Sequence, residues 1–207
     1  MEKIPTLFER GYDHKVIDKI TKGCEWVKIP HQALVTEKLD GINVRLTVRS
    51  ERCVRVEKRR NPTKVQKNLG IVEPWYVDAD EFGKEDKWIF DAVKYTNLTG
   101  WPDGEHSCEA IGPNIQGNPL GLEYNRCVPF NRHSAIPIYR PIDITYEGIK
   151  SFLESLDSLY SPGHLAEGIV FHNSPSDGSE TTSMNLRAKI KRKDFSYGQQ
   201  PRQQASE

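Results

Sequence analysis

The 207-residue chain has few cysteines, no long apolar run and no excess of charge of either sign. Cys24, Cys53, Cys108 and Cys127 stand far apart, without a Cys-x-x-Cys pair or a histidine at zinc-ligand spacing. This argues against a disulfide framework and a structural metal site, and it predicts buried thiols. No apolar stretch approaches the roughly 20 residues of a membrane-spanning helix, and residues 1–5 show no signal or transit-peptide pattern. We therefore expect an intracellular, cytoplasmic protein with no membrane partner.

Basic and acidic side chains balance, with 29 of each. A net charge of zero argues against a protein that coats nucleic acid by bulk attraction. The local distribution is uneven, because basic side chains concentrate in Arg49–Lys67 and Arg187–Lys193, and acidic ones in Asp78–Asp86. A charge run alone usually marks a solvated face. These clusters therefore become informative only together with motifs.

The length suits one domain with a sizeable core, which we place at residues 1–197, followed by a disordered polar tail at 198–207. Side-chain alternation and turn signals predict strands at 33–37, 42–48, 53–58, 107–111, 168–172 and 186–191. The balance of elements predicts an α+β fold with a mainly antiparallel sheet system.

Two helices are predicted. A short one covers Tyr12 to Thr21. A longer one covers Tyr146 to Tyr160, with Thr145 as N-cap and Pro162-Gly163 as its stop. Its apolar side chains recur at helical spacing and are predicted to be core; they are Ile149, Phe152, Leu153, Leu156 and Leu159.

The segment Lys38-Leu39-Asp40-Gly41 forms the corner between the first two predicted strands. Such corners present side chains to ligands from a rigid base, although a lysine beside a turn is most often only solvated. A lysine amine, with an ordinary pKa of about 10.4, must lose its proton before it attacks phosphorus, so neighbouring cations or a metal ion are needed. Lys189 and Lys191 lie two apart on a predicted strand, so both project from one face and could meet an α-phosphate.

Two acids lie beside apolar strand segments. Glu167 leads into Gly168-Ile169-Val170, where a carboxylate is costly unless it is paired or bound to a metal, and Gly168 would permit close approach of a ligand. Mg²⁺ needs only one or two carboxylates besides water and phosphates. The alternative is an edge-strand glutamate beside a turn. Glu109 poses the same question, with a ribose hydroxyl as its candidate partner.

These elements, in this order, resemble the superfamily of ATP-dependent ligases and mRNA-capping guanylyltransferases. Its signature is a Lys-x-Asp-Gly motif, an Arg after the next strand, an acidic strand, a Glu-Gly-hydrophobic-Val strand and a final Lys-x-Lys strand. The matching segments are Lys38–Gly41, Lys58–Arg60, Glu109, Glu167–Val170 and Ala188–Lys191. The resemblance spans about residues 4–195. It implies a nucleotidyltransferase (ATP-grasp-like) domain of mainly antiparallel sheets flanked by helices.

Within the superfamily the details resemble RNA ligases. Asn43 stands five places after Lys38, as in the nick-sealing phage RNA ligases, where DNA ligases usually have Arg. The segment Gly23–Val27 is also similar to that branch, and Glu109–Leu122 is similar both to it and to vertebrate 5′-3′ RNA ligases. Glu167–His172 resembles the vertebrate group.

The resemblance implies roles for single residues. Lys38 would be the nucleophile, within a catalytic set that also includes Asp40, Lys189 and Lys191, the two C-terminal lysines meeting the α-phosphate. The other implied contacts are Glu37 against the adenine, Asn43 and Arg59 on the nucleotide or the RNA end, Glu109 on the ribose, Glu167 on the metal, and Val170 on one purine face. The other purine face would be covered by Ile136, Ile138 or Tyr139, and Arg60 remains an alternative to Arg59.

The implied activity is an ATP-dependent RNA ligase, monomeric, that forms a lysyl-AMP intermediate with Mg²⁺ or Mn²⁺. Its partner would be RNA with 5′-phosphate and 3′-hydroxyl ends. Only about a dozen residues follow the last lysine motif, so we expect no OB-fold domain. In the superfamily such a domain helps with substrate binding and with the steps after self-adenylylation. Self-adenylylation is therefore a more secure expectation than complete sealing. The alternatives are a capping guanylyltransferase, a DNA ligase, or a catalytically silent nucleic-acid-binding module.

Overall fold

The computed structural model describes residues 3–29, 33–130, 142–173 and 186–197, which fall into two compact units. Unit 1 comprises Met1–Ile4, Leu39–Pro137 and Asp157–Leu165, and unit 2 comprises Pro5–Lys38, Ile138–Leu156 and Ala166–Glu207. The predicted α+β fold with mainly antiparallel sheets is confirmed, since every pair of named strands is antiparallel. That the two units work as one domain stays a prediction.

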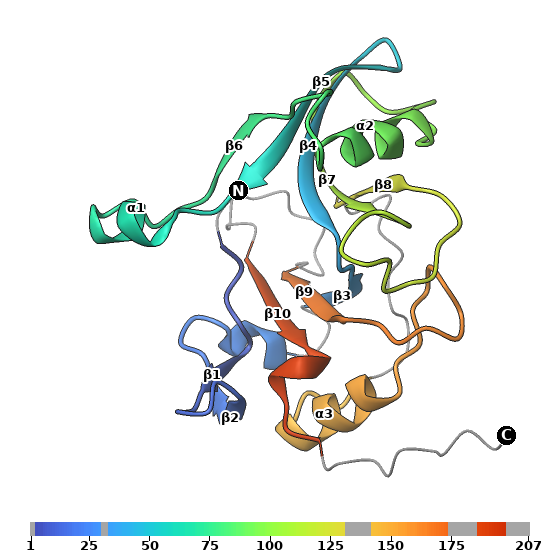
Figure 1. Cartoon of the computed structure of the whole chain (residues 1–207). Coiled ribbons are helices and arrows are strands. Elements are labelled where there is room, and N and C mark those ends of the chain that lie inside the picture. The colour runs from blue at the N-terminus through green and yellow to red at the C-terminus, as the bar shows by residue number, and fades with distance from the viewer. Residues whose placement is uncertain (1–2, 30–32, 131–141, 174–185, 198–207) are drawn as a thin grey trace, which may run out of the picture. The chain divides into compact units, whose positions relative to one another are not determined.

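Unit 2 is built around a three-stranded sheet in the order β10-β9-β3 (Figure 1). Its strands are β3 (Ala33–Lys38), β9 (Gly168–Asn173) and β10 (Arg187–Lys191). The helix α3 (Tyr146–Glu154) packs its buried side chains into one core with the apolar side chains of this sheet. That core includes Val35, Ile169, Phe171, Ala188 and Ile190 from the strands.

A hairpin of β1 (Phe8–Arg10) and β2 (Val16–Ile20) occupies the segment where a helix was predicted at 12–21, so that prediction is wrong. The loop between the strands is stabilised by the Gly11 amide donating to the Lys15 carbonyl and by the Lys15 amide donating to Asp13. The β-branched residues that follow favour an extended chain over a helix. Two short 3-10 helices complete the unit, η1 (Glu25–Lys28) and η2 (Arg192–Asp194).

The helix predicted at 146–160 begins where expected and ends early. Thr145 caps α3, because its hydroxyl accepts a hydrogen bond from the Gly148 amide at 3.1 Å. The helix stops at Glu154, well before Pro162-Gly163. Leu153 is buried as predicted, whereas Leu159 lies beyond the helix and is 39% exposed. The apolar spacing continued past the true end of the helix, which misled the prediction.

The N-terminal segment of unit 2 lies beside β10. The Leu7 amide donates to the Lys189 carbonyl at 2.8 Å, and the Lys189 amide donates to the Pro5 carbonyl at 3.0 Å. Thr6 and Lys189 thereby form a parallel bridge. The backbone of Lys189 is thus fixed by β9 on one side and by the first residues of the chain on the other.

Unit 1 contains a five-stranded sheet in the order β6-β5-β4-β7-β8. Its strands are β4 (Ile42–Arg49), β5 (Arg52–Arg60), β6 (Trp75–Asp78), β7 (Gly104–Ile111) and β8 (Arg126–Pro129). The helix α2 (Lys87–Lys94) buries Ile89 and Ala92 against Val44, Leu46 and Cys108 on one face of this sheet. The opposite face is largely polar, as the alternation in β4 and β5 predicts.

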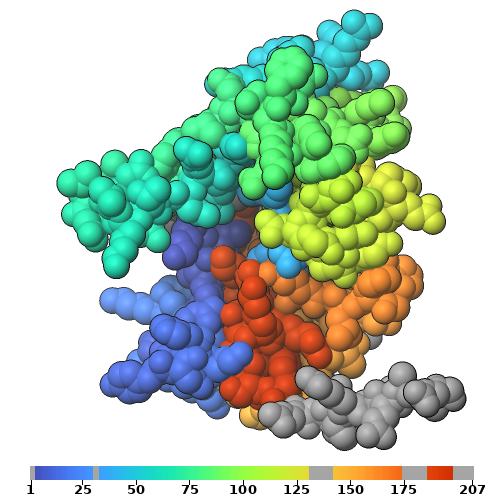
Figure 2. All heavy atoms as spheres, viewed as in Figure 1, coloured from blue at the N-terminus to red at the C-terminus, as the bar shows by residue number. Residues whose placement is uncertain are grey.

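The helix α1 (Lys64–Asn68) lies in the connection between β5 and β6, away from α2 (Figures 1 and 2). A capping box defines its start: the Gln66 amide donates to the Thr63 hydroxyl, and the Gln66 side chain accepts from the Thr63 amide. The exposed apolar side chains of this segment are Val65, Leu69, Ile71 and Val72.

All four cysteines are free, and Cys24, Cys108 and Cys127 are buried as predicted, while Cys53 is partly exposed. Burial raises the pKa of the Cys127 thiol to about 12, so it stays protonated at neutral pH. In the described ranges, no helix has the length and apolar character needed to cross a membrane.

The different burial of Leu153 and Leu159 can be tested with two leucine truncations. Leu153→Ala should lower the free energy of unfolding by roughly 2–5 kcal/mol, because Leu153 is fully buried and a cavity would remain. Leu159→Ala should cost less than about 1 kcal/mol, since that side chain already contacts solvent. Chemical denaturation of both variants measures the difference. Equal losses would mean that Leu159 is as deeply buried as Leu153.

Candidate active site

One face of the three-stranded sheet carries three lysines. Across the sheet, Lys38 pairs with Gly168 and Gly168 with Lys191, while Thr36 pairs with Val170 and Val170 with Lys189. Because side chains alternate along a strand, residues paired in these two rows, two positions apart, project from the same face. Lys38, Val170, Lys189 and Lys191 therefore share a face, opposite to the apolar face that packs against α3.

Glu167 bridges two of these lysines. Its Oε2 accepts a hydrogen bond from Lys38 Nζ at 2.5 Å, and its Oε1 accepts one from Lys191 Nζ. The Glu167 side chain is only 9% exposed, and the lysine side chains are 19% and 22% exposed. A carboxylate this deeply buried needs cationic partners, which explains why it lies between two ammonium groups.

The cluster of Lys38, Glu167 and Lys191 has an electrostatic consequence. Two ammonium groups and one carboxylate leave one net positive charge, and Lys189 on the same face adds another. Partial burial weakens screening by solvent, so a phosphate chain would be attracted to this face. The same geometry keeps the Lys38 amine within hydrogen-bond reach of a proton acceptor.

The structure explains why residue 168 is a glycine, which the sequence did not reveal. A Cβ at this position would lie 2.2 Å from the Ile190 carbonyl oxygen and 2.7 Å from the Lys191 Cα. Glycine is therefore required for β9 and β10 to pack closely beside Glu167. The expected close approach at Gly168 is made by the neighbouring strand.

Glu37 occupies the other face of the sheet. It pairs with Ile169, whose side chain is in the core, and its own side chain is 9% exposed. Alternation along β3 thus separates the Glu37 and Lys38 side chains. Only the backbone of Glu37 lies next to the lysine, so a contact with adenine from this residue would come from its main chain.

The donor set suits a hydrated divalent cation. Within the described ranges, no group of three or more His, Cys, Asp or Glu side chains could hold a metal by itself. Glu167 offers one buried carboxylate beside the lysines. Mg²⁺ commonly takes one or two carboxylates and completes its shell with water and substrate phosphates, so Glu167 fits such an ion when a nucleotide supplies the phosphates.

In unit 1, the predicted ligands Glu109, Asn43 and Arg59 lie in one row of the sheet. Asn43 pairs with Glu109 on β7, and Arg59 stands one position beyond the Val44–Lys58 pair on β5, which places it next to Asn43. Arg60 falls on the opposite face by alternation. The register therefore favours Arg59 over Arg60 as the arginine of this row.

The corner after Lys38 packs against the same row. The Gly41 amide donates to Glu109 Oε1 at 3.2 Å, and a Cβ on Gly41 would lie 2.2 Å from the Ala110 carbonyl oxygen. The motif glycine is thus needed for close packing on β7. Asp40 precedes it at the corner and is partly exposed. Ile136, Ile138 and Tyr139, the candidates for the other purine face, lie outside the described residues.

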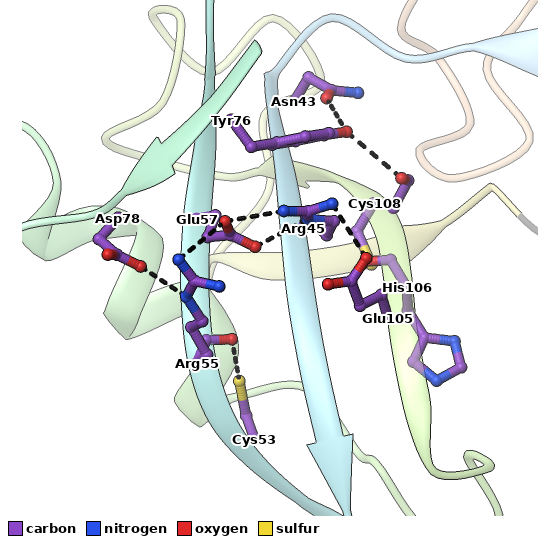
Figure 3. Close-up of polar contacts among 11 residues, drawn as sticks. Asn43, Arg45, Cys53, Arg55, Glu57, Tyr76, Asp78, Glu105, His106 and Cys108 are labelled. Carbon is purple, nitrogen blue, oxygen red and sulfur yellow. Dashed lines mark hydrogen bonds and ion pairs between the residues drawn. The ribbon is translucent and has the colours of Figure 1, made fainter. Parts of the chain in front are cut away.

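A polar network that the sequence did not predict lies on the same face of unit 1 (Figure 3). The Tyr76 hydroxyl donates to Asn43 Oδ1 at 2.8 Å, and the Arg45 guanidinium lies 4.5 Å from the centre of the Tyr76 ring. Arg45 donates to both oxygens of Glu57, at 2.7 and 2.8 Å, and to Glu105 at 2.9 Å. The sequence predicted the strand that carries Arg45, but only the pairing of distant strands brings Tyr76 and Glu57 beside it.

No protein-family model and no curated protein sequence matches the chain. Among solved structures, it is similar to an RNA ligase of Naegleria gruberi in a mutant apo form, with 12% identity over 93% of this chain and 58% of that chain, at a TM-score of 0.44. A mutant of that ligase with ATP and manganese gives 14% identity over 93% and 58%, at a TM-score of 0.46. The chain thus spans 58% of the length of these structures. The function of this chain is therefore inferred from its own residues and not from these structures.

The Arg45–Glu57 pair makes a prediction about pH. Hydrogen bonds from Arg45 lower the pKa of Glu57. The pair's contribution to stability is then complete above the unfolded-state pKa of about 4.3 and is lost as the pH falls through the lower folded-state value. Glu57→Gln should therefore cost on the order of 1–3 kcal/mol at pH 7, and the deficit should shrink below about pH 4.

Thermal melts of wild type and Glu57→Gln from pH 7 to pH 3 measure this effect. The exposed Glu81→Gln is the matched control and should leave the melting temperature unchanged throughout. A deficit for Glu57→Gln that stays constant with pH would show that the loss comes from packing and not from the charge.

Proposed function

We propose that this protein is an ATP-dependent RNA ligase that adenylylates itself on Lys38, transfers AMP to an RNA 5′-phosphate and joins that end to a 3′-hydroxyl. The observation that carries the proposal is the grouping of Lys38, Glu167 and Lys191 on one face of a sheet, with Lys189 and Val170 beside them. A lone surface lysine would have none of these neighbours. The five motifs resemble the superfamily of ligases and capping enzymes, and Asn43 with the segments Gly23–Val27 and Glu109–Leu122 resembles its RNA ligases, which supports the same proposal.

In the first step the Lys38 nitrogen attacks the α-phosphorus of ATP. A nitrogen–phosphorus bond forms, the bond from the α-phosphorus to the bridging oxygen breaks, and pyrophosphate leaves with the electron pair. The proton lost by the amine passes to a neighbouring acceptor, and Glu167 Oε2 is already in contact with that nitrogen. The product is AMP joined to Lys38 as a phosphoramidate.

The charges around Lys38 suit this step. Lys189 and Lys191 would hold the α-phosphate and offset negative charge that grows on its oxygens. In the described state Lys38 Nζ donates a hydrogen bond to Glu167, so this contact must break before the nitrogen attacks. A Mg²⁺ or Mn²⁺ ion bound at Glu167 would screen phosphate charge and favour the neutral amine.

The remaining site residues would bind the nucleotide and the RNA. Val170 would contact one purine face, Glu109 would accept hydrogen bonds from ribose hydroxyls, and Asn43 and Arg59 would contact phosphate. In the second step the RNA 5′-phosphate displaces Lys38 from AMP, and in the third the 3′-hydroxyl displaces AMP and closes the strand. Each transfer is in-line phosphoryl chemistry, in which the protein positions groups and offsets charge.

The basic clusters would contribute to RNA binding unequally. In Arg49–Lys67, Arg55 pairs with Asp78 and Glu57, and Lys58 pairs with Asp86. These cations are therefore largely neutralised within unit 1. The exposed cations of that segment are better placed to meet phosphates; they are Arg49, Arg52, Arg60, Lys64 and Lys67.

The decisive experiment is incubation with α-labelled ATP and Mg²⁺ or Mn²⁺, followed by denaturing electrophoresis. Wild type should retain label on the protein, and Lys38→Ala should retain none, because the attacking nitrogen is gone. Lys191→Ala and Glu167→Gln should each lower the rate of labelling by about 10²-fold or more, since charge stabilisation in a partly buried site is lost. Lys193→Ala is the matched control and should label normally, because Lys193 is a nearby lysine outside the cluster of Lys38, Glu167 and Lys191.

Further arms separate the alternatives. Label from GTP in preference to ATP would indicate a capping guanylyltransferase, and sealing of DNA nicks in preference to RNA would indicate a DNA ligase. A wild-type protein that binds RNA but takes no label from either nucleotide would be a catalytically silent module. Label retained on Lys38→Ala would refute the assigned nucleophile.

A further inference from the structure

The Tyr76 side chain connects strands that are not neighbours in the sheet. Tyr76 lies on β6 opposite Arg59 on β5, yet its hydroxyl donates to Asn43 Oδ1 on β4 at 2.8 Å and lies 3.3 Å from Ser107 Oγ on β7. The phenol ring thus reaches past β5 to the centre of the polar face (Figure 3). A tyrosine that served only to cover the sheet would not need to place its hydroxyl on a side-chain amide.

The Tyr76 ring is held in place by a chain of charged groups. The guanidinium of Arg45 lies 4.5 Å from the ring centre, in the arrangement of a cation–π contact. Arg45 is itself fixed by two hydrogen bonds to Glu57, which is 2% exposed, and by one to Glu105. A buried carboxylate therefore sets the position of the guanidinium, and the guanidinium supports the ring.

The hydrogen bond from Tyr76 determines what Asn43 can offer a ligand. A side-chain amide has one oxygen acceptor and two N–H donors, and its orientation is set by its partners. With Oδ1 engaged by the Tyr76 hydroxyl, Nδ2 is left to face a ligand as a donor. Asn43 then resembles its neighbour Arg59, which has donors only.

Arg59 adds a second indication of the ligand. Its Nε atom is buried and, within the part of the chain that the structure describes, has no hydrogen-bond partner. Asn43 Nδ2 and the Arg59 guanidinium are both hydrogen-bond donors and one of them is cationic, so the pair matches an anionic oxygen, while Glu109 on the other side of Asn43 supplies the acceptor of the row. The ligand chemistry that fits this pair is a phosphate.

We infer that Tyr76 is a positioning residue, which orients the Asn43 amide so that Nδ2 binds a phosphate of the substrate. The phosphate belongs either to ATP or to the 5′ end of RNA, and both share this chemistry. The inference rests on the proposed function for its substrate, and on the Tyr76–Asn43 hydrogen bond for its mechanism. Tyr76 does not touch the reacting atoms; it acts through its hydrogen bond to Asn43.

A double-mutant cycle tests the inference. Wild type, Tyr76→Phe, Asn43→Ala and the double variant are compared for equilibrium binding of α,β-methylene ATP and of a 5′-phosphorylated RNA oligonucleotide. Neither ligand can react, since the first has no cleavable α–β bridge and the second is offered without ATP. Phenylalanine keeps the ring beside Arg45 and removes only the hydroxyl. Tyr95→Phe, at an exposed tyrosine elsewhere in unit 1, is the matched control.

Tyr76→Phe should weaken binding of at least one ligand about three- to tenfold, the range expected for one lost hydrogen bond. Asn43→Ala should weaken the same ligand, and adding Tyr76→Phe to it should have no further effect, because the two residues act as one unit. The affected ligand identifies the source of the phosphate. If the RNA is affected, the loss should disappear with a 5′-hydroxyl oligonucleotide; if the nucleotide is affected, it should disappear with adenosine.

Other outcomes overturn the inference. Independent, multiplicative losses in the double variant would show that Tyr76 does not act through Asn43. Equal losses with and without the phosphate, no loss with either ligand, or no binding of either ligand by wild type would contradict a phosphate contact. Failure of the proposed function looks different: Lys38 would take no label from ATP, while the coupling between Tyr76 and Asn43 would still be measured in binding.

Discussion

The chemistry proposed for this protein depends on one interaction, the carboxylate of Glu167 held between the ammonium groups of Lys38 and Lys191. The Glu167 carboxylate is the most buried of the three charges, and the two ammonium groups offset the cost of removing it from water. Their meeting follows from strand register, because Lys38, Gly168 and Lys191 stand in one row of the β3-β9-β10 sheet. Gly168 allows β9 and β10 to pack closely, since any side chain there would collide with the backbone of β10. Strand packing in this way brings the Lys38 amine, a carboxylate and a second amine together.

Much of this sheet could be predicted from the sequence, because alternation and turn residues are local signals. The strands around Lys38, the common face of Lys189 and Lys191, and the cap at Thr145 needed no knowledge of distant contacts. The local signals failed where two patterns compete. Residues 12–21 have helical spacing as well as β-branched residues, and pairing with β1 decides for a strand. The helical spacing of apolar residues continues past Leu153 into a loop, where Leu159 is exposed.

Other features could not be predicted because they arise only when distant segments pair. Strand β5 pairs with β4 on one side and with β6 on the other, and these two pairings bring together the side chains of Arg45, Glu57 and Tyr76. Nothing near Tyr76 in the sequence marks it as a partner of Asn43. Strand pairing also changes how the basic cluster is understood. Arg55 and Lys58 are part of a run of positive charge in the sequence, yet in the sheet each faces a carboxylate. The basic run is thus partly neutralised locally, in addition to the overall balance of charge.

The bridge between Thr6 and Lys189 has a consequence for how the chain is made. Unit 2 combines segments that are more than 100 residues apart in the sequence, so its sheet cannot close before β10 has been synthesised. Until Lys191 has left the ribosome, Lys38 has neither Glu167 nor the C-terminal lysines beside it. Contacts between residues so far apart in sequence also form slowly. A nascent chain would therefore have no assembled lysine cluster until the segment through Lys191 has been synthesised.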